Sequence, residues 1–312
     1  MTGTEDLTAL SVDVEEHFQV EAFADRISPE MWSGFPSRVV ENTGRVLDLL
    51  QSCGAKATFF ILGYVAERSP ELVRRIAKAG HEVACHGYWH KRVNTMTPNQ
   101  FRDDLRRSKA AVEDAAGARV SGYRAPTFSL VRESLWALDI LAEEGFHYDS
   151  SVFPVRHDFY GIPDAPRVIY RWQCSRGLEL YEIPPLTLHF LGTNLAAGGG
   201  GYLRILPMWF TRWALRQAHR EQRPAVIYFH PWEIDPSQPR LPGTWKSRFR
   251  HYRNLDKMEA RLRTLMQSGR FLTMRELLEH QKAGHPEATY TPAEIAGGRG
   301  FFPPGDEGLD PG

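Results

Sequence analysis

The sequence has few cysteines, no excess of charge of either sign and no long apolar run. Its three cysteines show no paired spacing. They are expected to be free thiols, as in a reducing compartment, although secreted proteins can also have few cysteines. Lys+Arg and Asp+Glu number 38 each, so no global field favours nucleic acid or an anionic membrane, and any specificity must be local.

Targeting and membrane-spanning signals are also missing from the sequence. No run approaches the roughly 18 apolar residues of a spanning helix. The short polar stretch 1–6 is not followed by the basic and apolar regions of a signal peptide. We therefore expect a cytoplasmic protein with no transmembrane segment and no nucleic-acid partner.

The composition is that of a soluble globular protein, with 42% apolar and 24% charged residues in 312. Short apolar runs alternate with segments of helical periodicity, and the links between them are short. This alternation is typical of βα units and predicts a parallel sheet. The predicted strands are residues 8–14, 57–62, 81–85, 120–124 and 225–229, and the predicted helices include 38–52, 69–80, 97–117, 132–144, 209–219 and 255–267.

Two polar clusters follow predicted strands and have the residue types of a metal site. Asp13 and Glu15 are two residues apart at the end of a strand, so both side chains point to the same side. His86 and His90 are four residues apart and share a face if the backbone there is helical. Two histidines and one carboxylate leave a divalent metal open to water, and the second carboxylate is free to act as a base. These residues indicate a hydrolase.

Three further polar residues follow other predicted strands. Arg124 precedes Ala125-Pro126, Asp149 follows a short apolar stretch, and His230 closes the strand 225–229. Taken singly, Arg124 could be a turn arginine and Asp149 a loop acid or a cap, whereas a strand-end histidine such as His230 often faces the site in an α/β protein. Because active sites of parallel α/β folds lie at the carboxyl ends of the strands, their joint placement predicts one shared site.

The motifs and their order resemble the polysaccharide deacetylase (NodB homology) family of metal-dependent N-deacetylases. The resemblance covers about residues 7–280. It implies a distorted parallel (β/α) barrel, as one domain over residues 1–280 with an inserted and C-terminal covering extension at about 154–280. Residues 281–312 are expected to form a flexible tail. The matching motifs are Ser11-Val12-Asp13-Val14-Glu15, His86 to His90, Arg124-Ala125-Pro126, Tyr148-Asp149-Ser150-Ser151 and His230.

The resemblance implies a role for each residue of the site. Asp13 would be the catalytic base, with Arg124 orienting it and keeping it ionised. His230 would protonate the leaving amine, and Asp149 would hold the His230 imidazole in its productive tautomer and orientation. The implied ligands of a divalent metal, expected to be Zn²⁺, are Glu15, His86 and His90.

The first motif departs from the family pattern, because Glu15 stands where the family has aspartate. A longer acid needs a shifted metal, and the neighbouring Glu16 is an alternative ligand. Glu15 is favoured because its side chain points to the same face of the strand as that of Asp13.

Three segments resemble a narrower group, the exopolysaccharide-locus deacetylases associated with exosortase systems. They are residues 12–18, residues 228–236 and the glycine-rich residues 198–207.

The predicted function is the hydrolytic removal of N-acetyl groups from amino sugars of a polysaccharide or of its lipid-linked precursor. Tyr88, Trp89 and Trp232 flank the motifs and either stack on sugar rings or belong to the wall of the barrel. One alternative is a hydrolase of a small cyclic amide on the same scaffold, and another is a non-catalytic sugar-binding protein. The expected partner is an N-acetylated carbohydrate. The oligomeric state, a homo-oligomer included, stays open, as do the roles of His189 and the glycine run 198–201.

Overall fold

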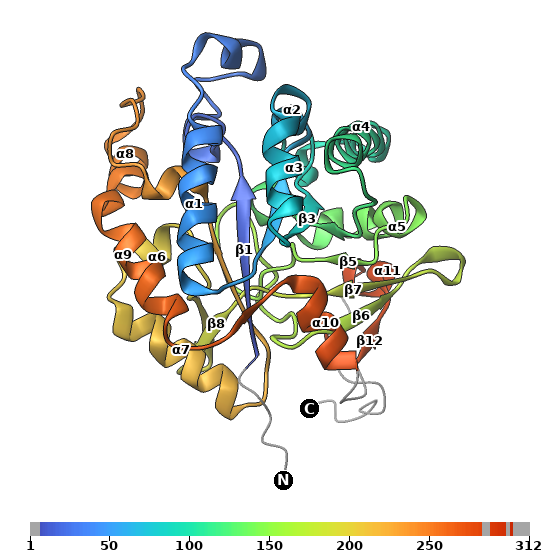
Figure 1. The fold of residues 1–312 in the computed structure, drawn as a ribbon. Helices are drawn as coiled ribbons and strands as arrows, with labels where there is room; N and C mark the ends of the chain where they lie inside the picture. Colours follow the sequence, from blue (N-terminus) through green and yellow to red (C-terminus); the bar gives the residue numbers. More distant parts are fainter. Residues whose placement is uncertain (1–6, 283–287, 298–299, 302–312) are drawn as a thin grey trace.

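A computed structural model describes residues 7–282, 288–297 and 300–301. The strands of its main sheet are β1 (Thr8–Val14), β2 (Thr58–Ile61), β3 (Glu82–Cys85), β4 (Gly122–Tyr123), β5 (Tyr148–Asp149), β6 (Tyr170–Gln173), β7 (Glu179–Glu182), β10 (Ala225–Phe229), β11 (Phe271–Leu272) and β12 (Thr289–Tyr290). They follow the order β10-β1-β2-β3-β4-β5-β7-β6-β12, and β11 also pairs with β1 (Figure 1). A separate antiparallel hairpin joins β8 (Thr187–Phe190) and β9 (Thr193–Ala196).

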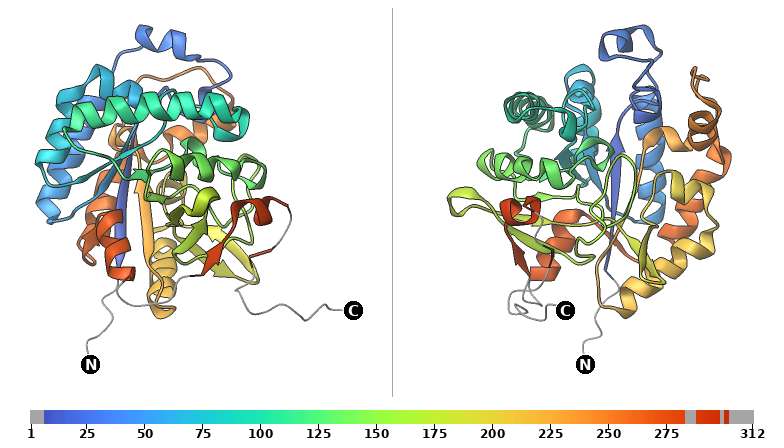
Figure 2. Two further views of the ribbon diagram at one scale, coloured as in Figure 1. Left: turned by 90° about the vertical axis from the view of Figure 1, so that its right-hand side faces the viewer. Right: turned by 180° about the vertical axis from the view of Figure 1, so that it is seen from behind.

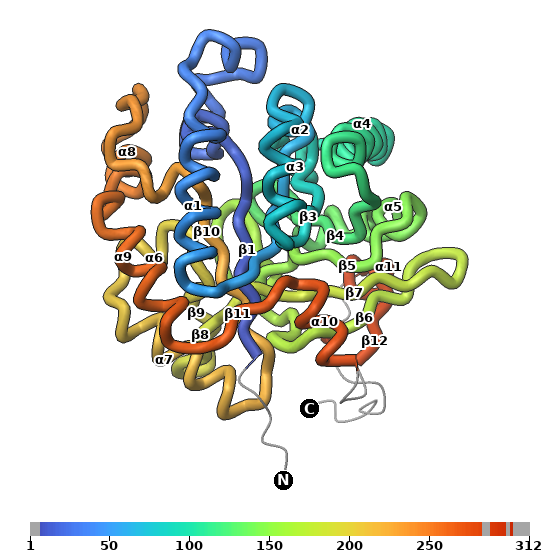
Figure 3. Tube along the Cα trace, viewed as in Figure 1, coloured from blue at the N-terminus to red at the C-terminus, as the bar shows by residue number. Residues whose placement is uncertain are grey.

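Helices surround the sheet in the two views of Figure 2, while β1 and β10 run through the interior. The tube in Figure 3 shows the same path along the chain, coloured from the N-terminus to the C-terminus. The helices are α1 (Val39–Cys53), α2 (Gly63–Arg68), α3 (Pro70–Lys78), α4 (Pro98–Ala116), α5 (Trp136–Glu143), α6 (Gly201–Ile205), α7 (Met208–Arg220), α8 (Trp245–Tyr252), α9 (Leu255–Met266), α10 (Met274–Lys282) and α11 (Pro292–Ala296).

Strand β1 is central and buried along its whole length, between β10 and β2 in parallel register. Its alternate residues therefore face two apolar environments. Leu10, Val12 and Val14 pack in the large core cluster beneath the helices, and Ala9 belongs to a smaller cluster inside the sheet. Because side chains alternate along a strand, the polar residues of odd number face the inside at its carboxyl end.

The expected α/β fold with a mostly parallel sheet is confirmed. Within the described residues the order runs from β10 to β12 without a closing pair, and β6 pairs with β7 in the antiparallel sense. The predicted helix 97–117 corresponds to α4, which begins with a capping box between Thr97 and Gln100 and ends at Gly117 in the left-handed conformation.

The prediction of a flexible tail over 281–312 is wrong for its described residues. Strand β12 adds to the sheet beside β6, and α11 follows it. Tyr290 of β12 packs on Tyr170 and Trp172 of β6, which explains why this short segment is ordered. The remaining positions of the predicted tail, 283–287, 298–299 and 302–312, lie outside the described residues. In the described part of the chain, no helix has the length and apolar character needed to cross a membrane.

Candidate active site

The strand ends on one side of the sheet open into a cavity of about 490 Å³. Asp13 and Glu15 reach it from the end of β1, His86 and His90 from the segment after β3, and His230 from the end of β10. The parallel sheet therefore brings together residues that are up to 217 positions apart in the sequence, as predicted from their positions after strands.

Glu15, His86 and His90 form one cluster whose potential ligand atoms all lie within 4.8 Å of one another. Glu15 Oε2 lies 2.7 Å from His90 Nε2, yet this buried oxygen makes no hydrogen bond. A buried carboxylate oxygen without a hydrogen bond is costly unless another group binds it. A carboxylate and two imidazoles fit a divalent metal ion that keeps an open position.

The His86–His90 segment is a bent loop, so the helical arrangement considered from the spacing is wrong. Gly87 has φ +74° and His90 has φ 51°, and these left-handed residues turn the chain so that the two imidazole rings lie 5.5 Å apart. The Asp104 carboxylate of α4 fixes this loop by accepting the backbone N–H of Tyr88 at 2.8 Å. Helix α4 thereby stabilises the loop that carries His86 and His90.

Hydrogen bonds around the cluster orient its members. His86 Nδ1 donates to the backbone carbonyl of Arg124 at 2.8 Å, which leaves Nε2 as the free acceptor. Burial lowers the pKa of His86 to about 4, which favours the neutral ring that a metal needs. Trp232 Nε1 donates to Glu15 Oε1 at 3.1 Å. Burial raises the pKa of Glu15, but the nearby His90 and His230 outweigh it and lower the pKa to about 2.

The structure distinguishes Glu15 from Glu16. Glu16 points away from the cluster, where its carboxylate accepts the backbone N–H of Arg38 at 3.0 Å and the hydroxyl of Ser37. These bonds attach the β1 end to the start of α1. Glu15, which lies on the same face of the strand as Asp13, is the acid of the cluster.

We expect Glu15→Gln to weaken metal binding by more than about 100-fold, the upper end of the usual cost of losing an outer partner of a metal ligand. Glu16→Gln should leave metal affinity within a few-fold of wild type, because an amide can still accept from Arg38. Elemental analysis and metal titration of both purified variants measure this difference. The reverse order of affinities would show that Glu16 is the ligand.

Asp13 and Arg124 form a fully buried ion pair beside the cluster. Arg124 Nη1 donates to Asp13 Oδ1 at 2.7 Å and to the Ser11 hydroxyl at 2.8 Å. Its other nitrogens bond to the Ser150 carbonyl and hydroxyl at 3.2 and 3.1 Å. Each polar atom around the guanidinium thus has a partner, which is what makes a buried charge tolerable. The Asp13 carboxylate is held in place with Oδ2 facing His230 Nε2 at 4.0 Å.

The carboxylate that orients His230 is Glu233, and the prediction that gave this role to Asp149 is wrong. His230 Nδ1 lies 3.1 Å from Glu233 Oε2, and the backbone N–H of His230 donates to the same oxygen at 2.9 Å. The buried Arg204 of α6 donates to Glu233 Oε1 at 2.6 Å. Burial lowers the pKa of His230, but the carboxylates of Glu15, Glu233 and Asp13 outweigh it and raise the pKa to about 9.

Asp149 belongs to a separate buried pair of acids. Its carboxylate accepts the Ser151 hydroxyl at 2.5 Å and the Ser151 N–H at 3.1 Å, and it neighbours Glu182 of β7. Within the described residues no hydrogen bond joins Asp149 to His230. Burial raises the pKa of Asp149 to about 6, and burial together with the Asp149 charge raises the pKa of Glu182 well above its usual range. Two close acids in a dry site retain a proton.

The raised pKa of Asp149 predicts the direction in which stability changes with pH, and this change can be measured. An acid whose folded pKa lies above its unfolded value holds more protons in the folded state, so its contribution to stability falls as pH rises between about 4 and about 6. Asp149→Asn should therefore gain stability relative to wild type across this window, by at most about 1.4 kcal/mol per pH unit. Chemical unfolding of both proteins at several pH values measures the difference. A difference independent of pH would contradict the shared proton.

The three aromatic residues that either stack on sugars or form the wall lie in different surroundings. Tyr88 is buried, bonds to Glu67 and does not line the cavity. Trp89 lines a neighbouring groove beside Trp32. Trp232 borders the cavity, but its ring stacks between His230 at 5.2 Å and His251 at 4.2 Å. Stacking on a sugar by Tyr88 or by the face of Trp232 is thus excluded by their packing.

Sequence reasoning missed much of the cavity wall. Arg204 and Glu233 belong to no motif of their own, although Glu233 stands three residues after His230 in the segment 228–236. That spacing was the available signal. The other unpredicted lining residues include Phe128, Arg156, His157, Tyr160, Tyr202, Tyr228 and Arg250.

The glycine run 198–201 lies against the strand that ends at His230. A Cβ on Gly199 would fall 1.7 Å from the Tyr228 carbonyl oxygen, and Gly199 has φ +151°. The backbone on either side of Gly199 bonds to Tyr228. The N–H of Gly200 donates to the Tyr228 carbonyl, and the N–H of Tyr228 donates to the Gly198 carbonyl. Only glycine permits this approach. His189 lies in the hairpin, where Nδ1 pairs with Asn194 at 2.9 Å, and it does not line the cavity.

Comparisons with known proteins agree with this site. Residues 29–146 match the family model described as polysaccharide deacetylase, and residues 150–279 match a model described as a domain of unknown function, DUF3473. The first segment holds His86, His90 and Arg124, and the second holds His230 and Glu233.

Curated relatives match over part of their length. A peptidoglycan deacetylase of Helicobacter pylori is 35% identical over 115 residues, which are 37% of this chain and 38% of the relative. A chitooligosaccharide deacetylase of Bradyrhizobium is 33% identical over 101 residues, which are 32% of this chain and 43% of the relative. The alignments thus span less than half of these relatives.

Solved structures show the same fold over nearly the whole chain. A putative polysaccharide deacetylase of Mycobacterium smegmatis has a TM-score of 0.62 at 22% identity, covering 90% of this chain and 92% of that one. A probable polysaccharide deacetylase of Pseudomonas aeruginosa PAO1 has a TM-score of 0.61 at 16% identity, and the Puue allantoinase has a TM-score of 0.59 at 16% identity. Each of these two likenesses covers 92% of this chain and 94% of the other. At these identities the likeness concerns the fold alone.

Proposed function

We propose that this protein is a metal-dependent hydrolase that removes N-acetyl groups from amino sugars of a polysaccharide or of its lipid-linked precursor. The observation that carries the proposal is the joint presence, in one cavity, of the Glu15–His86–His90 cluster, the Asp13 carboxylate held by Arg124 and the oriented His230. The family match and the deacetylase relatives support the same class of reaction.

Glu15, His86 and His90 would hold the metal, expected to be Zn²⁺, which supplies an acidified water and polarises the acetyl carbonyl. Asp13 accepts the proton of the attacking water. Its ion pair with Arg124 keeps the carboxylate in one orientation. The attack converts the amide carbon to a tetrahedral centre that carries one added oxygen.

Breaking the C–N bond needs a proton on the leaving nitrogen. His230 presents Nε2 to the cavity because Nδ1 is turned toward Glu233. The imidazolium donates this proton to the amine as the bond breaks, and the acetyl group leaves as acetate. Glu233, held by Arg204, fixes the ring so that the donating nitrogen faces the substrate.

The cavity is consistent with a sugar residue carrying an N-acetyl group. Aromatic rings of Phe128, Tyr160, Tyr202 and Tyr228 line one wall, and these rings offer apolar faces with polar edges. Its volume of about 490 Å³ falls within the usual range of small-molecule sites. We further propose the exopolysaccharide-locus subgroup, exopolysaccharide biosynthesis and a cytoplasmic location, all of which rest on the sequence alone.

Acetate release by the Zn²⁺-loaded full chain from N-acetylglucosamine oligomers tests the proposal, with Asp13→Asn as the inactive control. Turnover that requires metal supports it. Opening of allantoin without acetate release would instead identify a cyclic-amide hydrolase on the same scaffold. Saturable binding of the oligomers without any turnover would identify a sugar-binding protein.

A further inference from the structure

Helix α7 presents tryptophan and arginine on its outward face. Its inward residues Thr211, Ala214, Leu215 and Ala218 are buried against the sheet. Because each residue turns a helix by about 100°, the outward positions 209, 212, 213, 216 and 220 fall within an arc of roughly 100°. Trp209 is 60% exposed on this face, an unusual position for the largest apolar side chain in a soluble domain.

The tip of the β8–β9 hairpin extends the same face. Phe190 is 45% exposed and Leu191, at the turn, is 86% exposed. Trp213 joins the two elements, with its ring 5.5 Å from Phe190 and 6.5 Å from Trp209. The backbone of His189 also exchanges hydrogen bonds with the Gln217 side chain. The α7–hairpin surface, defined here by Phe190, Leu191, Trp209, Arg212, Arg216 and Arg220, is therefore one continuous patch.

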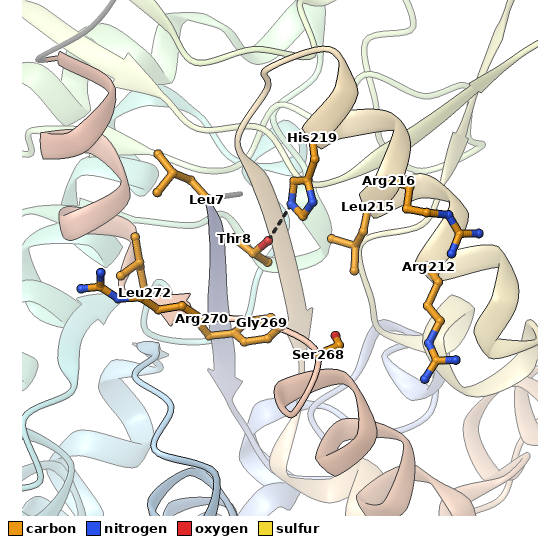
Figure 4. A pocket seen from close by; sticks show the side chains of 11 residues that line it. Leu7, Thr8, Arg212, Leu215, Arg216, His219, Ser268, Gly269, Arg270 and Leu272 are labelled. Carbon is orange, nitrogen blue, oxygen red and sulfur yellow. Dashed lines mark hydrogen bonds between the residues drawn. The ribbon is translucent and has the colours of Figure 1, made fainter. Parts of the chain in front are cut away.

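The charge of this patch has a single sign. Residues 183–220 contain no Asp or Glu, although the chain as a whole has as many acids as bases. Arg212, Arg216 and Arg220 form no ion pair within the described part of the chain. Figure 4 shows Arg212 and Arg216 extending from α7 at the edge of a pocket of about 530 Å³ that Arg270 also lines. Arginines at a pocket of this size can surround a phosphate group.

We propose that the α7–hairpin surface binds the headgroup region of an anionic lipid bilayer. Tryptophan and phenylalanine favour the interface between water and acyl chains, and arginine is attracted to anionic headgroups. The exposed Leu191 at the hairpin tip has no use in binding phosphate alone, whereas it can enter the acyl boundary. A symmetric contact with a second copy would place these arginines against each other, which disfavours a dimer.

Helix α6 links the surface to the wall of the candidate active site. Ile205 of α6 lines the cavity and is 36% exposed, and only four positions separate it from Trp209. Arg212 and Arg216 line the pocket beside Leu7 and Thr8, at the amino-terminal end of β1, whereas the cavity lies at its carboxyl end. Membrane binding does not depend on the proposed chemistry, because the α7–hairpin surface contains none of Glu15, His86 and His90.

Co-sedimentation of the full chain with vesicles tests this inference. We expect binding to vesicles of phosphatidylcholine mixed with phosphatidylglycerol, weaker binding at high salt, and none to phosphatidylcholine alone. Arg212→Gln/Arg216→Gln/Arg220→Gln and Leu191→Ser/Trp209→Ser should each reduce binding at least about tenfold. The matched controls are Arg119→Gln and Met31→Ser, at exposed positions outside the surface.

Thermal unfolding and acetate release from a soluble oligomer should be unchanged in both sets of variants, which separates membrane binding from folding and from the proposed function. Absence of vesicle binding by the wild-type chain would overturn the inference. Equal binding by all variants would overturn it as well. Self-association, or nucleic-acid binding lost with the arginines alone, in place of vesicle binding would assign the surface to a different partner.

Discussion

Asp13→Asn is expected to keep the bound metal and lose nearly all deacetylase turnover, on the order of 10²–10⁴-fold for loss of a well-placed base. Asp13 is not a member of the Glu15–His86–His90 cluster, and its carboxylate faces Arg124 at 2.7 Å. Asparagine has the same shape and can still accept from Arg124, but it cannot take a proton from water. The expected loss is therefore in kcat, with metal content unchanged.

The measurement is kcat together with metal stoichiometry and a thermal unfolding curve. Breaking a buried ion pair can cost several kcal/mol, so the unfolding curve separates lost chemistry from lost structure. Glu16→Gln is the matched control, because it changes a buried carboxylate only three residues away that bonds to Ser37 and Arg38 instead. Loss of metal in Asp13→Asn would show that Asp13 is a ligand and that the base is another group.

His230→Ala should lose most activity on N-acetyl sugars and much less on an activated aryl acetate ester. An amine is a poor leaving group unless it is protonated, whereas a phenolate leaves without that help, and a positioned histidine typically contributes on the order of 10²–10⁴. The measured quantity is the ratio of amide to ester activity. Equal loss on both substrates would mean that His230 binds substrate or shapes the cavity.

Glu233→Gln should show the same selective loss in milder form, because Glu233 acts through the His230 imidazole at 3.1 Å. Glu233→Asp should recover part of the amide activity if a carboxylate at this place is what matters. Asp149→Asn is the contrasting variant, and its amide-to-ester ratio should equal that of wild type, because its carboxylate bonds to Ser151. A ratio lowered in Asp149→Asn and not in Glu233→Gln would reverse the roles that the structure gives them.

Local patterns in the sequence were enough to predict the parallel α/β fold and the edge at which the site forms. Alternating apolar runs and helical segments are local patterns, and so are start and stop signals such as Thr97-Pro98 and Gly117. The parity of Asp13 and Glu15 also comes from the sequence, because alternation along a strand is a fixed property of extended backbone. Because His86, Arg124 and His230 each follow a strand of a parallel sheet, their sequence positions were enough to predict that they lie in one region.

The contacts between side chains depend on how the elements pack, which no local pattern predicts. The strand-end position of Asp149 equally allowed a bond to His230, but the packing of β5 against β7 places it beside Glu182, and Glu233 takes that role from the turn after β10. The orientation of Tyr88 depends on α4 and Glu67, which are separate in sequence from its own strand. Periodicity records which face of an element is buried, whereas a hydrogen bond across elements depends on their relative placement to within an ångström.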